Sequence, residues 1–114
     1  MYNLIKNKSI DTDIILNSLQ NPIIVINSLK KTIVYCNNET ENFLNKSKKQ
    51  IIGKKIDNIF IRDSNFINII NKSISDNRNS LAHNVKISLY NKSLDISISI
   101  SKTDINKLFC IVIK

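Results

Sequence analysis

Two stretches in the last third of the chain alternate strictly between apolar and polar residues. They cover residues 85–90 and 94–101. A period of two is typical of a β-strand that buries one face and exposes the other. With Asn91 and Lys92 as the turn, the two stretches form an antiparallel hairpin. The expected register pairs Leu89 with Leu94, Ile87 with Ile96 and Val85 with Ile98.

Three further apolar runs predict the rest of a sheet. The runs Ile23 to Ile26 and Thr32 to Cys36 predict two strands, and the loop 27–31 between them is short enough for a hairpin. The run Leu108 to Ile113 is apolar on both faces, which suits a central strand. Five strands are therefore expected.

Helical spacing of apolar residues appears before the first strand and again in the middle of the chain. Asp11 can cap a short helix that Pro22 stops. A longer helix is predicted from about Ser64 to Asp76, because its apolar residues share one side. Those residues are Phe66, Ile67, Ile70 and Ile74.

Two capping boxes predict short helices between residues 38 and 53. Asn38 with Glu41 forms the first, and Ser47 with Gln50 forms the second. Gly53 is the only glycine in the chain, and a left-handed C-terminal cap is the commonest reason for a glycine there.

This order of elements predicts an α+β fold. Five antiparallel strands form one sheet, helices inserted between the second and third strands cover one face, and a short helix precedes the sheet. Residues 1–9 are polar without clear period and predict a flexible arm, so that residues 10–114 form a single domain.

Composition and charge exclude several classes of function. Ile, Asn and Lys make up half of the chain, and the net charge is +8. The lysines are spread in pairs at 30–31, 48–49 and 54–55, without the aromatic platform that single-stranded nucleic acid requires. We therefore expect a solvated lysine-rich surface, with neither nucleic acid nor membrane as a partner.

Neither cysteine belongs to a motif for metal or redox chemistry. Cys36 and Cys110 each lie inside an apolar run, where free cysteine commonly acts as a small buried side chain. The chain has no signal-peptide core and no apolar stretch long enough to span a membrane, which predicts a cytoplasmic domain. One glycine cannot form a phosphate-binding loop, and the acidic residues are too scattered to suggest a catalytic pair. Asp57, Asp63 and Asp76 are better interpreted as residues at helix and loop boundaries.

The chain resembles a PAS domain, and more narrowly the N-terminal sensor domain of NtrB-type nitrogen regulation histidine kinases. The resemblance rests on the runs ILNSL at 15–19, PIIVI at 22–26 and IVYCN at 33–37, with Asn37 at a strand-to-helix junction and Gly53 beyond it. It implies a regulatory segment without catalytic residues, whose parent protein carries the kinase domains.

The same resemblance raises two kinds of cofactor chemistry. Some PAS domains bind haem through a histidine, but His83 is predicted on a strand, on the face shared with Val85 and opposite Ile100. Flavin photosensors use a cysteine on a helix, whereas Cys36 precedes Asn37 at the end of a strand. We expect no cofactor and no metal.

Two candidate sites remain. PAS folds often keep a cavity between helices and sheet, although bulky isoleucines can fill it. Its candidate lining residues are Tyr35, Phe43, Phe66, Ile70, Val85, Ile87, Ile96 and Ile98. The first helix presents an apolar stripe that either packs against a second copy of the chain or folds back on its own sheet. The candidate dimer-interface residues are Ile15, Leu16 and Leu19.

The resemblance therefore predicts a PAS sensor and dimerisation domain of a two-component histidine kinase. The predicted partners are a second copy of the chain and the downstream kinase domains. Two alternatives stay open: a receptor for a small molecule or cofactor, and a PAS module of a DNA-binding transcription regulator.

Overall fold

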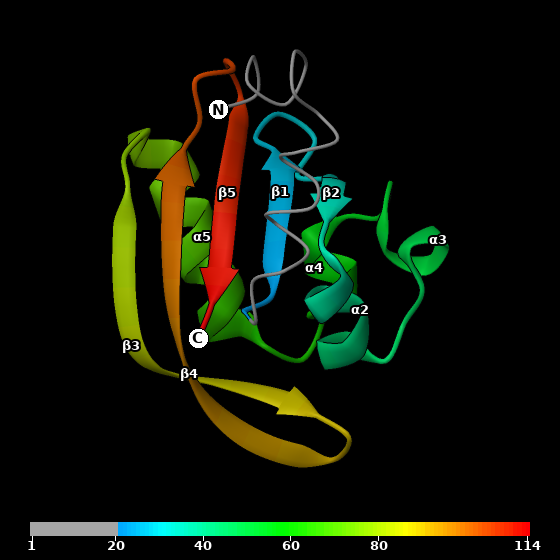
Figure 1. Ribbon diagram of the computed structural model, residues 1–114. Helices are drawn as coiled ribbons and strands as arrows, with labels where there is room; N and C mark the ends of the chain where they lie inside the picture. The colour runs from blue at the N-terminus through cyan, green and yellow to red at the C-terminus, as the bar shows by residue number, and fades with distance from the viewer. Residues whose placement is uncertain (1–20) are drawn as a thin grey trace.

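The computed structural model describes residues 21–114. They form a five-stranded antiparallel sheet and four helices (Figure 1). The strands are β1 (Ile23–Asn27), β2 (Ile33–Cys36), β3 (Ser80–Leu89), β4 (Lys92–Lys102) and β5 (Leu108–Ile113). The helices are α2 (Asn38–Leu44), α3 (Lys48–Ile51), α4 (Ile56–Ile59) and α5 (Ser64–Asp76). The predicted arm 1–9 and the helix starting near Asp11 lie outside the described residues.

The sheet order is β2-β1-β5-β4-β3, so the first and last strands lie next to each other near its middle. The prediction that residues 108–113 form a central strand is confirmed. The α+β class with helices between the second and third strands is also confirmed. None of the helices in residues 21–114 has the length and apolar character needed to cross a membrane.

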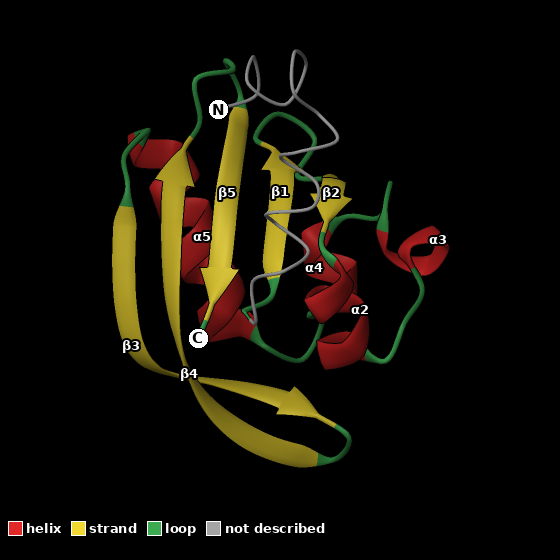
Figure 2. Cartoon of the chain, viewed as in Figure 1, coloured by secondary structure: helices red, strands yellow, loops and turns green. Residues whose placement is uncertain are grey.

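The core lies between the helices and one face of the sheet, which we call the inner face. Figure 2 shows α5 crossing behind β4 and β5. The helix extends over the predicted residues, and its side chains Phe66 and Ile70 are fully buried. The Phe66 ring packs on Phe60 with 4.5 Å between ring centroids. Helical spacing in the sequence therefore correctly identified the side of α5 that packs on the sheet.

The cap of α2 differs from the prediction by one residue. Asn37, not Asn38, occupies the N-cap, and its side chain accepts a hydrogen bond from the backbone N–H of Thr40. The carboxylate of Glu41 does not complete a capping box, because it accepts from the backbone N–H of Lys48 at 3.0 Å. Asn37 is extended and so satisfies the N-cap geometry, whereas Asn38 is already helical.

The second predicted cap and the role of the glycine are confirmed. The side chain of Gln50 accepts from the backbone N–H of Ser47 at 2.9 Å, the returning bond of a capping box. Gly53 follows α3 with φ of +84°, and a Cβ built there would meet no atom within 4 Å. The glycine is therefore required by backbone conformation and not by lack of space.

The register of the β3–β4 hairpin differs from the prediction by two residues. Leu89 pairs with Lys92, Ile87 with Leu94 and Val85 with Ile96. The turn consists of Tyr90 and Asn91, which both have positive φ (52° and 62°). A two-residue hairpin turn with positive φ at both positions matches the twist of the strands, and this local requirement sets the register.

The alternation predicted that His83 shares the apolar face of Val85. This prediction is wrong. The pairing shifts between Ala82 and Val85, and Asn84 within this bulge has φ of 56°. The extra residue turns His83 out to solvent, where its Nδ1 lies 3.0 Å from the Ser97 hydroxyl. It pairs with neither Ile100, which faces Ser80, nor any core residue.

Candidate functional site

The junction between β2 and α2 is a buried polar cluster that holds the start of β1. The Asn37 side-chain oxygen Oδ1 accepts from the backbone N–H of Ile23 at 3.0 Å and of Thr40 at 3.1 Å. Its amide nitrogen donates to the Asn21 carbonyl at 3.0 Å. Both Asn37 and Thr40 are completely buried. We call these two residues the Asn37–Thr40 cluster.

Thr40 adds a second connection to the same strand. Its hydroxyl oxygen lies 2.8 Å from Asn37 Oδ1 and 3.0 Å from the Ile23 carbonyl, so its single proton serves one or the other. It also accepts from the Ile23 N–H at 3.1 Å. The sequence singled out Asn37, but not Thr40. A threonine in the first turn of a helix, three residues after an N-cap asparagine, was the available signal.

The point where the chain leaves the sheet lies beside the point where β1 begins. The backbone N–H of Ile113 donates to the Pro22 carbonyl at 3.0 Å. Lys114 exchanges two backbone hydrogen bonds with Ser97, at 2.8 and 3.1 Å. Residues that precede β1 and residues that follow β5 are thus connected through one end of the sheet (Figure 1).

The face of the sheet opposite the helices, which we call the outer face, is apolar along β1 and β5. Ile23 pairs with Val112 and Val25 pairs with Cys110, and all four lie outside the core cluster on the inner face. Ile23 and Val25 are buried, and Val112 and Cys110 are half-buried. An apolar outer face beside the chain's start and exit is a surface suited to a further layer of protein.

Most of the predicted pocket residues meet in the core. Fully or almost fully buried members of the core cluster are Phe66, Ile70, Val85, Ile87, Ile96 and Ile98, and Phe43 packs against it in a partly buried position. Tyr35 pairs with Val25 and so lies on the outer face, away from the other seven. The predicted interface residues Ile15, Leu16 and Leu19 lie outside the described residues.

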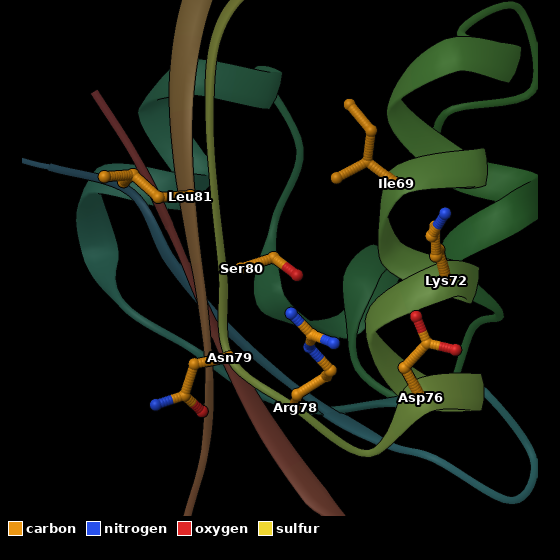
Figure 3. Close-up of a pocket in the computed structure, with 7 residues that line it drawn as sticks. All are labelled: Ile69, Lys72, Asp76, Arg78, Asn79, Ser80 and Leu81. Atoms are coloured by element: carbon orange, nitrogen blue, oxygen red, sulfur yellow. The ribbon is translucent and has the colours of Figure 1, made fainter.

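The surface pockets beside α5, at the β1–β2 loop and at the β3–β4 turn are lined by other side chains. One of about 590 Å³ lies between α5 and the start of β3. Figure 3 shows Lys72 and Asp76 on the helix, with Arg78 pointing toward Ser80 across the pocket. The Ser80 hydroxyl is hydrogen-bonded to Ser73. The pocket combines both signs of charge at the surface and does not include the predicted cavity residues.

Asp63 is a polar core residue that the sequence marked only as a boundary. It occupies the N-cap position of α5, as a boundary residue would, and only 6% of its surface is exposed. Its carboxylate accepts from the backbone N–H of Ser88 at 2.8 Å. The Tyr90 hydroxyl donates to the Phe43 carbonyl at 3.1 Å. These bonds hold the β3–β4 hairpin against the helices.

The two thiols lie on opposite faces of the sheet. Cys36 pairs with Ile24 and is buried in the core, whereas Cys110 lies on the outer face. Burial raises the pKa of both thiols, and Lys48 offsets part of the effect at Cys36. Both therefore stay protonated at neutral pH, the unreactive form.

A family model described as the PAS fold matches residues 11–108. The chain belongs to the PAS family. This PAS domain is therefore a sensor module rather than an enzyme. No protein of curated function matches the sequence.

Solved structures of PAS domains share the fold at low sequence identity. The PAS domain of nitrogen regulation protein NR(II) from Vibrio parahaemolyticus is 13% identical, with a TM-score of 0.74 over 90% of this chain and 95% of that one. The photoactive yellow protein domain of the sensor histidine kinase Ppr from Rhodospirillum centenum is 9% identical, with a TM-score of 0.77 over 87% and 94%. A PAS domain from a two-component sensor histidine kinase is 10% identical, with a TM-score of 0.73 over 96% of both chains.

These likenesses confirm the predicted fold of this PAS domain, including its similarity in structure to the nitrogen-regulation sensor. At such identities they show the fold alone, so the role of the domain must be argued from its own surfaces.

Proposed function

We propose that this PAS domain is the regulatory sensor and dimerisation domain of a sensor histidine kinase of the nitrogen-regulation type, acting in the cytoplasm. The observation that carries the proposal is the hydrogen bond from Ile113 to Pro22, which joins the start and the exit of the domain at the apolar outer face. The similarity to a domain of a nitrogen regulation protein and to domains taken from sensor histidine kinases supports the same role.

The proposed mechanism uses the outer face as the contact between two copies. Packing of a second copy against Cys110 and Val112 would bury apolar side chains that are still partly exposed, beside the buried Ile23 and Val25. A shift in that packing displaces β5. The displacement reaches the exit of the domain, where Ile113 bonds to Pro22 and Lys114 bonds to Ser97. The kinase domains of the parent protein follow from there and carry the catalysis.

The packing of the inner face favours a role in protein contacts and argues against the binding of a metabolite in the core. Phe66, Ile70 and Ile98 are fully buried in one continuous apolar cluster, so a ligand would have to separate side chains that already pack together. A receptor for a small molecule remains the second function of this kind of domain, and it would use the same predicted lining residues.

Native mass spectrometry of the purified chain tests the proposal. We expect a dimer without additional mass. Val112→Asp places a charge on the apolar part of the outer face and should weaken the dimer by at least about tenfold. Ser93→Asp is the matched control, because Ser93 is an exposed residue of β4 that pairs with Ser88 in the polar part of the same face.

A monomeric wild-type chain, or equal dimerisation of the two variants, would contradict the proposed interface. A stoichiometric mass excess would instead identify a small-molecule receptor. The predicted stripe is tested by Ile15→Asp, which should dissociate the dimer and leave the circular dichroism spectrum unchanged if that residue contacts the second copy.

A further inference from the structure

The structure brings together lysines that are far apart in the sequence. The loop 28–32 between β1 and β2 lies against the loop 52–55 between α3 and α4. The contact consists of a bridge between Thr32 and Lys55, a bond from Ile56 N–H to the Lys31 carbonyl at 2.9 Å, and a bond from Ile33 N–H to the Lys54 carbonyl at 2.9 Å. The lysine pairs 30–31 and 54–55, which are far apart in the sequence, therefore lie together at one place on the surface.

A third loop adds another lysine. The backbone N–H of Ser28 donates to the Lys107 carbonyl at 2.7 Å, which joins the β4–β5 loop to the same group. Figure 1 shows the β1–β2 and β4–β5 loops at the end of the sheet opposite the C-terminus. We call this surface the lysine end. Its members are Lys30, Lys31, Lys54, Lys55 and Lys107.

The lysine end surrounds an open pocket of about 580 Å³. Leu29, Lys30, Lys31, Thr32, Lys55 and Asp57 line it. Asp57 is the one carboxylate in that lining, against three lysines, so the lining has a net positive charge. Lys30 and Lys55 are exposed, and their charges reach solvent on flexible stems.

An exposed leucine lies among these lysines. Leu29 is 67% exposed in the loop 28–32. Asn27 holds the turn, because its side-chain oxygen accepts from the Leu29 N–H at 2.8 Å and its carbonyl accepts from the Lys31 N–H. The loop therefore exposes a large apolar side chain next in sequence to Lys30, and both residues line the same pocket.

We propose that the lysine end docks on a membrane surface that contains anionic phospholipids. Lysines near such a surface are attracted by its phosphates and carboxylates, and an apolar side chain among them enters the interface between headgroups and acyl chains. The three loops contain no arginine for bidentate capture of one phosphate group and no aromatic residue for stacking on bases, which argues against a phosphopeptide or a nucleic acid.

The position of the lysine end is compatible with the rest of the domain. It lies at the opposite end of the sheet from Pro22 and Ile113, where the chain enters and leaves. Docking there leaves the apolar outer face and the exit at Lys114 free. The inference therefore stands independently of the proposed kinase role.

Vesicle co-sedimentation of the 114-residue chain tests the inference. We expect binding to phosphatidylcholine vesicles that contain phosphatidylserine, none to pure phosphatidylcholine, and loss of binding at high salt. The variant Lys30→Gln, Lys31→Gln, Lys55→Gln should bind about 100-fold more weakly, because each lysine near an anionic surface contributes a factor of about five. Leu29→Ser should weaken binding about tenfold without changing the charge.

The matched control is Lys46→Gln, Lys72→Gln, Lys92→Gln, which removes the same charge from exposed lysines elsewhere. It should retain most of the binding. Equal losses in the two triple variants would mean nonspecific attraction by net charge and would overturn the inference. Wild-type binding to an acidic peptide or to single-stranded DNA, with no binding to phosphatidylserine vesicles, would also overturn it.

Discussion

The two halves of the sheet differ in their outer faces. Along β1 and β5 that face is apolar, with Ile23, Val25 and Val112. Along β4 and β3 the same face carries Ser97, His83 and other polar residues. Both halves bury an apolar inner face against the helices, so the core cannot explain the difference. The apolar half is the one on which the proposed second copy of the chain would pack, over the partly exposed Val112 and Cys110.

The halves are also held in different ways. The start of β1 is fixed by a buried polar cluster, in which Asn37 and Thr40 satisfy the backbone of Ile23. The register of the β3–β4 hairpin is set by backbone geometry, the positive-φ turn at Tyr90 and Asn91 and the bulge after Ala82. The first device depends on side-chain chemistry and the second on conformation, so substitutions should separate them.

The largest effect is expected at the Asn37–Thr40 cluster. Asn37→Ala removes the N-cap side chain, its bonds to the Ile23 and Thr40 N–H groups and its bond to the Asn21 carbonyl, which should lower the free energy of unfolding by about 2–3 kcal/mol. Urea unfolding followed by circular dichroism measures it. Asn68→Ala on the exposed side of α5 is the control and should change stability by less than about 0.5 kcal/mol. Equal effects would show that the cluster does not hold β1.

An intermediate effect is expected at the turn of the other half. Asn91→Val forces a β-branched residue to positive φ and should lower the free energy of unfolding by about 1–2 kcal/mol. Lys92→Val should be nearly neutral, because Lys92 is the first residue of β4. In the register predicted from the sequence, Lys92 is also a turn residue, and its replacement by valine would destabilise the hairpin as well. Comparable losses of stability in both variants would therefore count against the observed turn.

The smallest effect is expected on the polar outer face. Lys86 and Asp95 form a salt bridge at 2.9 Å between β3 and β4, and both side chains are mostly exposed. Removing it with Lys86→Met and Asp95→Asn, alone and together, should reveal a coupling of less than about 0.5 kcal/mol at low salt. A double-mutant cycle at two salt concentrations measures this. A larger coupling would mean that surface charge contributes substantially to this half.

Periodicity predicted the elements well and their alignment poorly. The bounds of α5 and β5 could be predicted, because the apolar spacing of the first fits only a helix and the continuous apolar run of the second suits a central strand. The hairpin register could not be predicted, because a slip of two residues keeps Val85 and Ile87 on the same face, and an alternating pattern cannot detect it. Only the need for positive φ at Tyr90 and Asn91 distinguishes the two registers.

The candidate site was foreseeable only in part. Asn37 marks a strand-to-helix junction in the sequence, but the partners of its side chain come from Asn21 and Ile23, across a hairpin. Tyr35 was grouped with the core because its neighbours are apolar, and the pairing with Val25 is what places it on the outer face. Likewise, the approach of Lys31 to Lys54 depends on the contact between two loops, which no local pattern encodes.

The position of β5 has a consequence for synthesis. It is the last strand of the domain to leave the ribosome, yet it lies between β1 and β4. Until it emerges, the β1–β2 and β3–β4 hairpins have no strand between them, and β1 and β4 each expose an unpaired edge. Closure of the sheet therefore waits for contacts between residues about ninety positions apart, such as Ile23 with Val112. Until β5 is added, those two edges are open to pairing with other chains.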